Sequence, residues 1–80
     1  MTAIELEKKT IEMLGASYQI MDTSFITRDT DIKAELSPSS LKMLGFVSTL
    51  EKELDVEIPL NQATKLKTVG EIIDLIAEQV

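Results

Sequence analysis

The chain has no histidine and no cysteine among its 80 residues, and these two absences exclude much chemistry. Without them, the usual nucleophile–base pairs and soft-metal sites cannot be built. No disulfide can form, so aliphatic packing must stabilise a core that buries only about 60–65% of the unfolded surface. The absence of cysteine also suits a reducing compartment, so we expect the protein to be cytoplasmic.

Long apolar runs and an excess of basic residues are missing as well. Apolar runs reach only two or three residues, so no segment is expected to span a membrane. The N-terminus has no basic start followed by an apolar stretch, which argues against a signal peptide. Lysine and arginine total 8 against 14 acidic residues, and the net charge is −6. That charge disfavours nucleic acid as a partner and suits basic protein surfaces.

The residues that are present predict one domain, residues 1–80, built from helices. A first helix is predicted over residues 2–14, where Thr2 and Glu5 have the spacing of a capping box. Gly15 is expected to end it in the left-handed conformation. Its apolar face is predicted to contain Ile4, Ile11 and Leu14.

Residues 15–38 show no clear period. A loop of this length in a small domain is usually functional or contains a short element. Its apolar residues indicate that it lies against the core rather than extending into solvent. The scattered apolar positions are Tyr18, Ile20, Met21, Phe25, Ile26, Ile32 and Leu36.

A second helix is predicted from Pro38 to about Leu54. Either Ser37 or Ser39 can be its N-cap, and the sequence does not choose between them. Gly45 inside this helix costs roughly 1 kcal/mol relative to alanine, or marks a close approach. The buried stripe is predicted to be Met43, Phe46, Val47, Leu50 and Leu54, with Leu41 and Leu44 partly off it.

Ile58-Pro59 interrupts the helical pattern, and a short helix is predicted at about residues 60–66. Thr68 and Glu71 repeat the capping-box spacing at the start of a last helix. Its apolar face is predicted to contain Val69, Ile72, Ile73 and Ile76, with Leu75 and Val80 at the edges. No stretch alternates as a strand would, so the prediction is an all-α fold with three long helices and one short helix.

Two acidic stretches are candidate binding sites, one beginning at Asp29 and one around Glu51 and Glu53. A calcium loop starting at Asp29 would need glycine at position 34 and glutamate at position 40, where this chain has Ala34 and Ser40. An acidic turn is the better interpretation, and no metal site is predicted. Glu51 and Glu53 lie in a charge-rich stretch, which is either a solvated helix end or a docking surface for a basic partner. Composition alone favours the solvated end.

Ser40 is the strongest candidate for a chemical role. It lies where the loop is predicted to become a helix, and a serine there is usually a cap or a first-turn residue. The functional alternative is that its hydroxyl accepts a phosphorus centre. The free N–H groups and partial positive charge of a helix N-terminus favour an attached phosphodiester. No base lies beside Ser40 in the sequence, so it would be an acceptor, and no enzyme activity is predicted.

Four stretches resemble an acyl carrier protein in order and spacing. They are residues 26–36, Ser39-Ser40-Leu41, residues 50–59 and residues 68–76. The most specific parts are the serine before a leucine at a helix start and the downstream Leu-Glu-x-Glu-Leu-x-x-x-Ile-Pro stretch. The resemblance covers about residues 26–77.

This resemblance implies a four-helix bundle with a short third helix and a long loop between its first two helices. It also implies that Ser40 receives 4′-phosphopantetheine from coenzyme A. The thiol of that arm would carry acyl groups as thioesters between enzymes of a fatty-acid, lipid or polyketide-type pathway. Partner binding would involve Leu41, Leu44, Glu51 and Glu53, and an acyl-chain pocket would involve Phe46, Leu50 and Ile58.

The partners implied are a phosphopantetheinyl transferase and acyl-transferring, acyl-activating or condensing enzymes with basic docking surfaces. The carrier itself is expected to be a monomer. Ser39 replaces the usual aspartate before the modified serine, and Lys42 and Gly45 stand where the family usually has acidic residues. We therefore expect a specialised carrier. The alternative is a carrier-like protein that is never modified and acts as a protein-binding adaptor.

Overall fold

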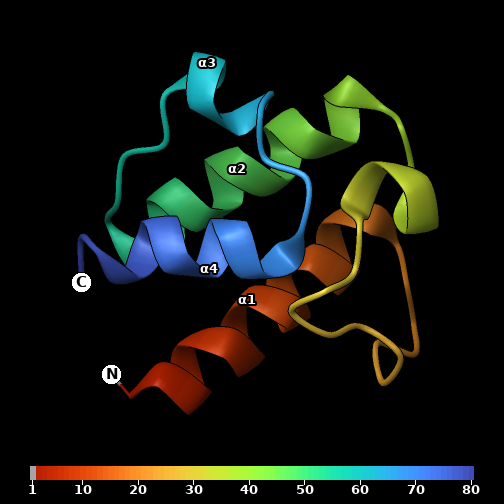
Figure 1. Ribbon diagram of the computed structural model, residues 1–80, viewed down its shortest axis with the longest axis horizontal. Helices are drawn as coiled ribbons and strands as arrows, with labels where there is room; N and C mark the ends of the chain where they lie inside the picture. Colours follow the sequence, from red (N-terminus) through yellow and green to blue (C-terminus); the bar gives the residue numbers. More distant parts are fainter. Residues whose placement is uncertain (1) are drawn as a thin grey trace.

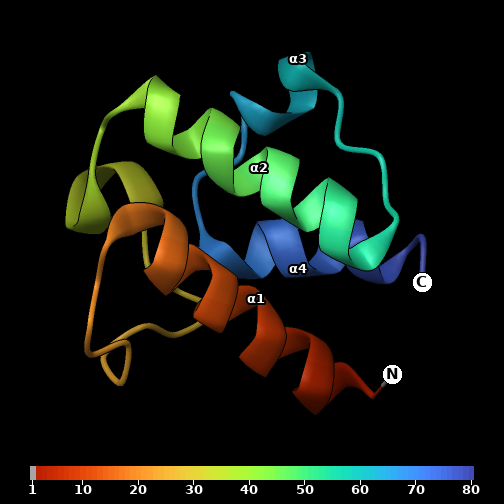
Figure 2. The ribbon, with the colours of Figure 1, turned by 180° about the vertical axis from the view of Figure 1, so that it is seen from behind.

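The computed structural model describes residues 2–80 as a bundle of helices (Figure 1). Its elements are α1 (Ala3–Tyr18), a short helical turn η1 (Ile32–Leu36), α2 (Ser40–Leu54), α3 (Leu60–Ala63) and α4 (Val69–Ala77). α1 packs against α2 and α4, and α2 also packs against α3. In both ribbon views α2 lies between α1 and α3 (Figure 2).

The predicted fold class is confirmed. Residues 2–80 contain three long helices and the short α3, and no strand runs through them. α3 is shorter than the predicted 60–66, because the chain turns after Ala63. None of the helices in residues 2–80 has the length and apolar character needed to cross a membrane.

Both predicted capping boxes are present. Thr2 Oγ1 accepts a hydrogen bond from Glu5 N at 3.1 Å, and Glu5 Oε1 accepts one from Thr2 N at 3.3 Å. Hydrogen bonds to the side chain and backbone of Thr2 lower the pKa of Glu5. Thr68 and Glu71 make the same reciprocal pair at the start of α4.

The predicted end of the first helix was wrong. α1 continues through Gly15 to Tyr18, and Gln19 is the left-handed C-cap with φ of 58°. Gly15 is needed for packing instead. A Cβ there would lie 2.6 Å from Thr23 Cγ2 and 3.2 Å from the carbonyl oxygen of Ile20. The segment after α1 therefore folds back across this glycine, a tertiary contact that a helix-ending rule does not contain.

The predicted apolar face of α1 is only partly right. Leu14 is fully buried and Ile11 packs at the core edge, whereas Ile4 is 68% exposed. The buried side of α1 is instead formed by Leu6, Thr10, Met13, Leu14 and Tyr18. These residues recur at helical spacing, and packing against α2 and α4 leaves Ile4 outside the buried face.

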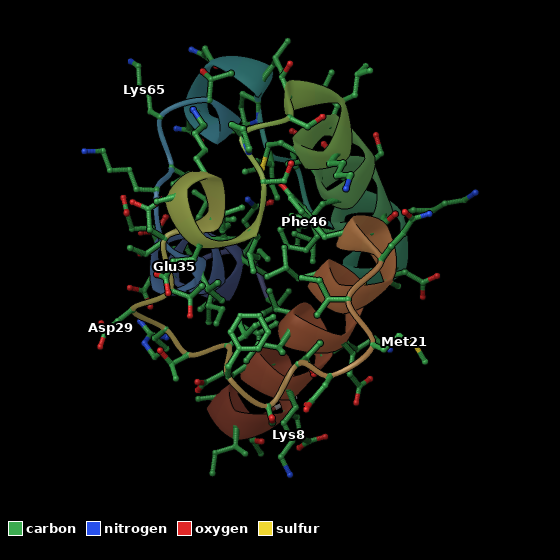
Figure 3. The ribbon with its side chains drawn as sticks, turned by 90° about the vertical axis from the view of Figure 1, so that its right-hand side faces the viewer. Lys8, Met21, Asp29, Glu35, Phe46 and Lys65 are labelled. Atoms are coloured by element: carbon green, nitrogen blue, oxygen red, sulfur yellow. The ribbon has the colours of Figure 1, made fainter. Side chains whose placement is uncertain are left out.

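The segment between α1 and α2 is held against the start of α4. Ile32 N donates to Lys67 O at 2.9 Å, Val69 N to Thr30 O at 3.1 Å, and Gly70 N to Arg28 O at 2.8 Å. Ile26 and Ile32 are buried, as expected for a segment lying on the core. Met21 and Phe25 are exposed instead, and Figure 3 shows the Met21 side chain directed outward.

The short element expected in this segment is η1, which closes with a hydrogen bond from Ser37 N to Ile32 O at 3.0 Å. Two acidic side chains cap its start, Asp31 just before η1 and Glu35 within it. Asp31 Oδ1 accepts from Ala34 N at 3.0 Å, and Glu35 Oε2 accepts from Asp31 N at 2.7 Å. Asp31 therefore has a local structural role.

The predicted stripes of α2 and α4 form most of the remaining core. Met43, Phe46, Val47 and Leu50 are buried, and Leu54 packs at the edge. Phe46 lies in the interior in Figure 3, with its ring edge-on to Tyr18 at 6.3 Å between centroids. All four predicted apolar residues of α4 are also buried: Val69, Ile72, Ile73 and Ile76.

Gly45 lies on an exposed face of α2, and a Cβ added there would meet nothing within 4 Å. We expect Gly45→Ala to stabilise the protein by about 1 kcal/mol, because alanine loses less backbone entropy in a helix. The melting temperature should rise by about 4–8 °C in thermal denaturation followed by circular dichroism.

Gly70→Ala is the matched control for Gly45→Ala. A Cβ at Gly70 would lie 3.0 Å from Arg28 O, which accepts the hydrogen bond from Gly70 N and so cannot easily move. This variant should melt below the wild type. An unchanged or lowered melting temperature for Gly45→Ala would show that the glycine serves a contact.

Candidate functional site

Ser40 is the first residue of α2, and Ser39 is the N-cap. Ser39 Oγ accepts from Lys42 N at 3.3 Å, and its carbonyl accepts from Met43 N at 3.2 Å. Ser37 Oγ accepts from Ser39 N at 3.2 Å instead of capping the helix. Of the two caps that the sequence allowed, the structure selects Ser39, and α2 begins after Pro38 rather than at it.

The two adjacent serines differ in what their hydroxyl groups do. Ser39 is half-buried, and its hydroxyl oxygen is engaged with the backbone of α2. Ser40 is exposed, and its hydroxyl makes no hydrogen bond within residues 2–80. Its position in the first turn places it beside backbone N–H groups that have no partner within the helix. Ser40 therefore presents an accessible oxygen at the positive end of a long helix.

A cavity of about 210 Å³ lies beside Ser40, between η1, α2 and α3. Lys33 Nζ donates to Thr64 O at 3.3 Å and so joins η1 to the end of α3 at its edge. The cavity wall is largely apolar, with Lys33 its one charged residue. The lining residues are Lys33, Ser40, Met43, Leu44, Leu60, Ala63 and Thr64.

The residues proposed for an acyl-chain pocket lie elsewhere. Phe46, Leu50 and Ile58 are almost completely buried in the core, and none lines the cavity beside Ser40. Leu60 and Ala63 do line it. The sequence does not identify these two residues as pocket residues, because only the placement of α3 against α2 brings them to Ser40.

Exposed leucines form an apolar rim beside this site: Leu44 and Leu60 line the cavity itself, and Leu41, which follows Ser40 in α2, lines a neighbouring pocket. Leu41 is 79% exposed, Leu44 40% and Leu60 58%. Exposed leucines gathered around one position are typical of a binding surface. Leu41 and Leu44 were expected here from the sequence, and Leu60 joins them from α3.

The acidic candidates are not part of this cluster. Glu51 and Glu53 follow Ser40 by 11 and 13 residues, so they lie roughly 16 Å or more away along α2. Glu53 is exposed, but Glu51 is half-buried and its Oε2 accepts from Ile58 N at 3.1 Å. Glu51 therefore fixes the chain as it leaves α2.

This contact predicts different effects for the two glutamates. Glu51→Ala should destabilise the protein by about 1–2 kcal/mol, because the half-buried Ile58 N–H would lose its acceptor. Glu53→Ala removes the same charge at an exposed position and should change stability by less than about 0.5 kcal/mol. Urea denaturation of both variants measures the difference. Equal losses would mean that the Glu51 hydrogen bond contributes nothing.

Comparison with known proteins identifies the chemistry that this site serves. The family model for the phosphopantetheine attachment site matches residues 11–76, which include Ser40 and the cavity beside it. The chain belongs to the acyl carrier protein family. It is 35% identical over 78 residues to an acyl carrier protein of Rickettsia canadensis, covering 98% of this chain and 90% of that protein. An acyl carrier protein of Porphyromonas gingivalis is 35% identical over 72 residues, covering 90% and 91% respectively.

Membership gives this carrier its cofactor and its general role. The cofactor is covalently attached 4′-phosphopantetheine, and the carrier works with a phosphopantetheinyl transferase and with enzymes that handle acyl groups. Acyl carrier proteins are carriers rather than catalysts, and this chain belongs to that family. Within residues 2–80, no cluster of three or more acidic side chains could hold a metal ion.

The residues around Ser40 suit this cofactor. A phosphodiester needs an accessible hydroxyl, and Ser40 is exposed without a competing hydrogen bond in residues 2–80. It also needs nearby positive potential, which the N-terminus of α2 supplies, and Lys33 lines the same cavity as Ser40. The apolar cavity and leucine rim can accompany an arm leaving this point.

Proposed function

We propose that Ser40 is the attachment residue for 4′-phosphopantetheine and that this chain is a specialised acyl carrier. The observation that carries the assignment is the contrast between the two serines. The Ser40 hydroxyl is exposed at the first turn of α2, whereas the Ser39 hydroxyl oxygen caps that turn. Modification of Ser39 would remove the cap, and modification of Ser40 would not.

In the modification step the Ser40 oxygen attacks the β-phosphorus of coenzyme A, the phosphoanhydride bond breaks, and adenosine 3′,5′-bisphosphate leaves. The transferase must supply the general base, because the only ionisable side chain that lines the cavity beside Ser40 is Lys33. This chain contributes the oxygen and the N–H groups of the first turn of α2, which favour the phosphate charge. When bound, the cofactor supplies a thiol that carries acyl groups as thioesters.

The charge around Ser40 supports a specialised role. Ser39 and Lys42 stand where the family usually has acidic residues, and Lys33 adds a cation at the cavity. The acidic Glu53 lies at the far end of α2. Partner enzymes would therefore meet an apolar, weakly basic surface beside the attachment residue.

Surface charge mainly sets association rates and partner choice. We propose service in a dedicated cytoplasmic lipid or polyketide-type pathway. The net charge of −6 still favours acyl-transferring, acyl-activating or condensing enzymes with basic surfaces, with the rim of Leu41, Leu44 and Leu60 as the contact near Ser40.

Intact mass spectrometry tests this proposal. After incubation with coenzyme A and a broad-specificity transferase, the chain should gain one phosphopantetheine. A transferase selective for the housekeeping fatty-acid carrier should modify it at least several-fold more slowly than its own carrier, because the acidic contacts near Ser40 are missing. Equal rates would refute the specialised role. No addition, under conditions that modify a control carrier, would favour the unmodified adaptor.

A further inference from the structure

The Gln79 side chain pairs with the backbone of the segment that joins α2 to α3. Gln79 Oε1 accepts from Glu57 N at 2.7 Å, and Gln79 Nε2 donates to Glu57 O at 2.7 Å. Both ribbon views place the C-terminal tail beside the start of this segment (Figures 1 and 2). One side-chain amide thus satisfies the backbone donor and acceptor of a residue 22 positions away, as a neighbouring strand would.

Gln79 is itself fixed to α4. Its backbone N–H donates to Ile76 O at 2.9 Å, and Glu78 N donates to Asp74 O at 3.3 Å. Ile76 is fully buried, so this end of α4 is anchored in the core. The Gln79 amide therefore connects the segment before α3 to a packed helix rather than to a loose stretch of chain.

α3 is a short helix with open space on two sides. It is four residues long, and its N-cap, Pro59, makes no side-chain hydrogen bond to it. The cavity beside Ser40 lies on one side, and a groove of about 420 Å³ separates residues 62–66 from α4 on another. At its far end Lys33 Nζ donates to Thr64 O at 3.3 Å. The position of α3 therefore depends strongly on the connections at its two ends.

The backbone before α3 transmits the restraint at Glu57. Ile58 follows it, and the Ile58 N–H donates to Glu51 Oε2 at 3.1 Å. Pro59 comes next, and its ring fixes φ at −58°. Few free backbone rotations remain before Leu60, the first residue of α3. Leu60 lines the cavity beside the attachment residue and is 58% exposed in the leucine rim.

We propose that Gln79 is a positioning residue for the partner surface around Ser40, because its amide fixes the start of α3 and so the place of Leu60. The inference rests on the proposed attachment at Ser40 and on the leucine rim as the partner contact. Gln79 does not line the cavity, so it acts through α3. It therefore affects how partner enzymes bind and not the chemical step.

Gln79→Met tests the positioning directly. Methionine keeps the length of the side chain and removes both hydrogen bonds. In residual dipolar couplings, the amides of Ala63 and Thr64 should lose about a third or more of their amplitude as α3 becomes mobile, whereas those of α2 and α4 should keep theirs. A general loss of stability would not produce this difference between helices, and a melting curve shows that the variant is folded.

Partner binding should change together with α3. For attachment by the broad-specificity transferase, Gln79→Met should raise KM several-fold and leave kcat unchanged, because it alters the docking surface and not the reacting group. Adding Gln79→Met to Leu60→Ala should raise KM no further, because the effect passes through Leu60. Val80→Ala is the matched control, since this exposed residue of the same tail should change neither KM nor the couplings.

The outcomes separate the two proposals. A wild-type chain that gains no phosphopantetheine overturns the attachment at Ser40 and the role of Gln79 together. With the arm attached, an unchanged KM or unchanged α3 couplings in Gln79→Met overturn the role of Gln79 alone. Effects of Gln79→Met and Leu60→Ala on KM that multiply in the double variant do the same.

Discussion

Ser40→Ala is expected to abolish attachment of 4′-phosphopantetheine completely, whereas Ser39→Ala is expected to retain it. The first substitution removes the exposed oxygen proposed as the acceptor. The second removes the oxygen that accepts from Lys42 N and caps α2. Intact mass spectrometry after incubation with coenzyme A and a broad-specificity transferase measures both results.

Stability should show the reverse order. Ser39→Ala should lose about 1 kcal/mol, because a first-turn N–H of α2 loses its side-chain acceptor. Ser40→Ala should change stability little, since the Ser40 hydroxyl makes no hydrogen bond in residues 2–80. Ser40→Ala should therefore affect attachment and not stability, and Ser39→Ala should affect stability and not attachment. Attachment that survives Ser40→Ala but not Ser39→Ala would reverse the assignment.

Leu50→Ala is expected to cost about 2–5 kcal/mol of unfolding free energy. Leu50 is fully buried in the stripe of α2, and truncation leaves a cavity in a small core. A domain of this size has a total stability of only about 4–12 kcal/mol, so the loss is a large fraction. Urea denaturation, with unchanged slope, gives the value.

Leu41→Ala is the matched control on the same helix, where the leucine is 79% exposed. It should change stability by less than about 0.5 kcal/mol. A loss below about 1 kcal/mol for Leu50→Ala would mean that its surroundings collapse easily. That result would favour the acyl-chain pocket proposed for Phe46, Leu50 and Ile58 over a rigid core.

Local sequence rules predicted the starts of α1 and α4 and the buried stripes of α2 and α4. Thr2 with Glu5 and Thr68 with Glu71 cap their own helices through contacts three residues apart, so no distant part of the chain is needed. The stripes of α2 and α4 follow from helical periodicity in the same way. Ser40 could be found from its position before a leucine at a helix start.

The same rules failed where a segment beyond the end of the helix decided the outcome. Gly15 follows an amphipathic stretch and reads as a helix end, yet the chain around Thr23 packs onto it inside α1. Glu51 reads as part of a solvated charge run, yet Ile58 N lies within hydrogen-bond distance. Neither contact can be predicted from the spacing of apolar and polar residues along the helix.

The sequence by itself determined the helical fold, the acyl carrier family and the serine proposed to bear the cofactor. Each of these follows from residues within one helix or from motif spacing along the chain. Only the tertiary structure decided which serine caps α2 and what lines the cavity beside Ser40. The physical reason is that η1, α2 and α3 meet there from separate parts of the chain, and their packing alone sets those distances.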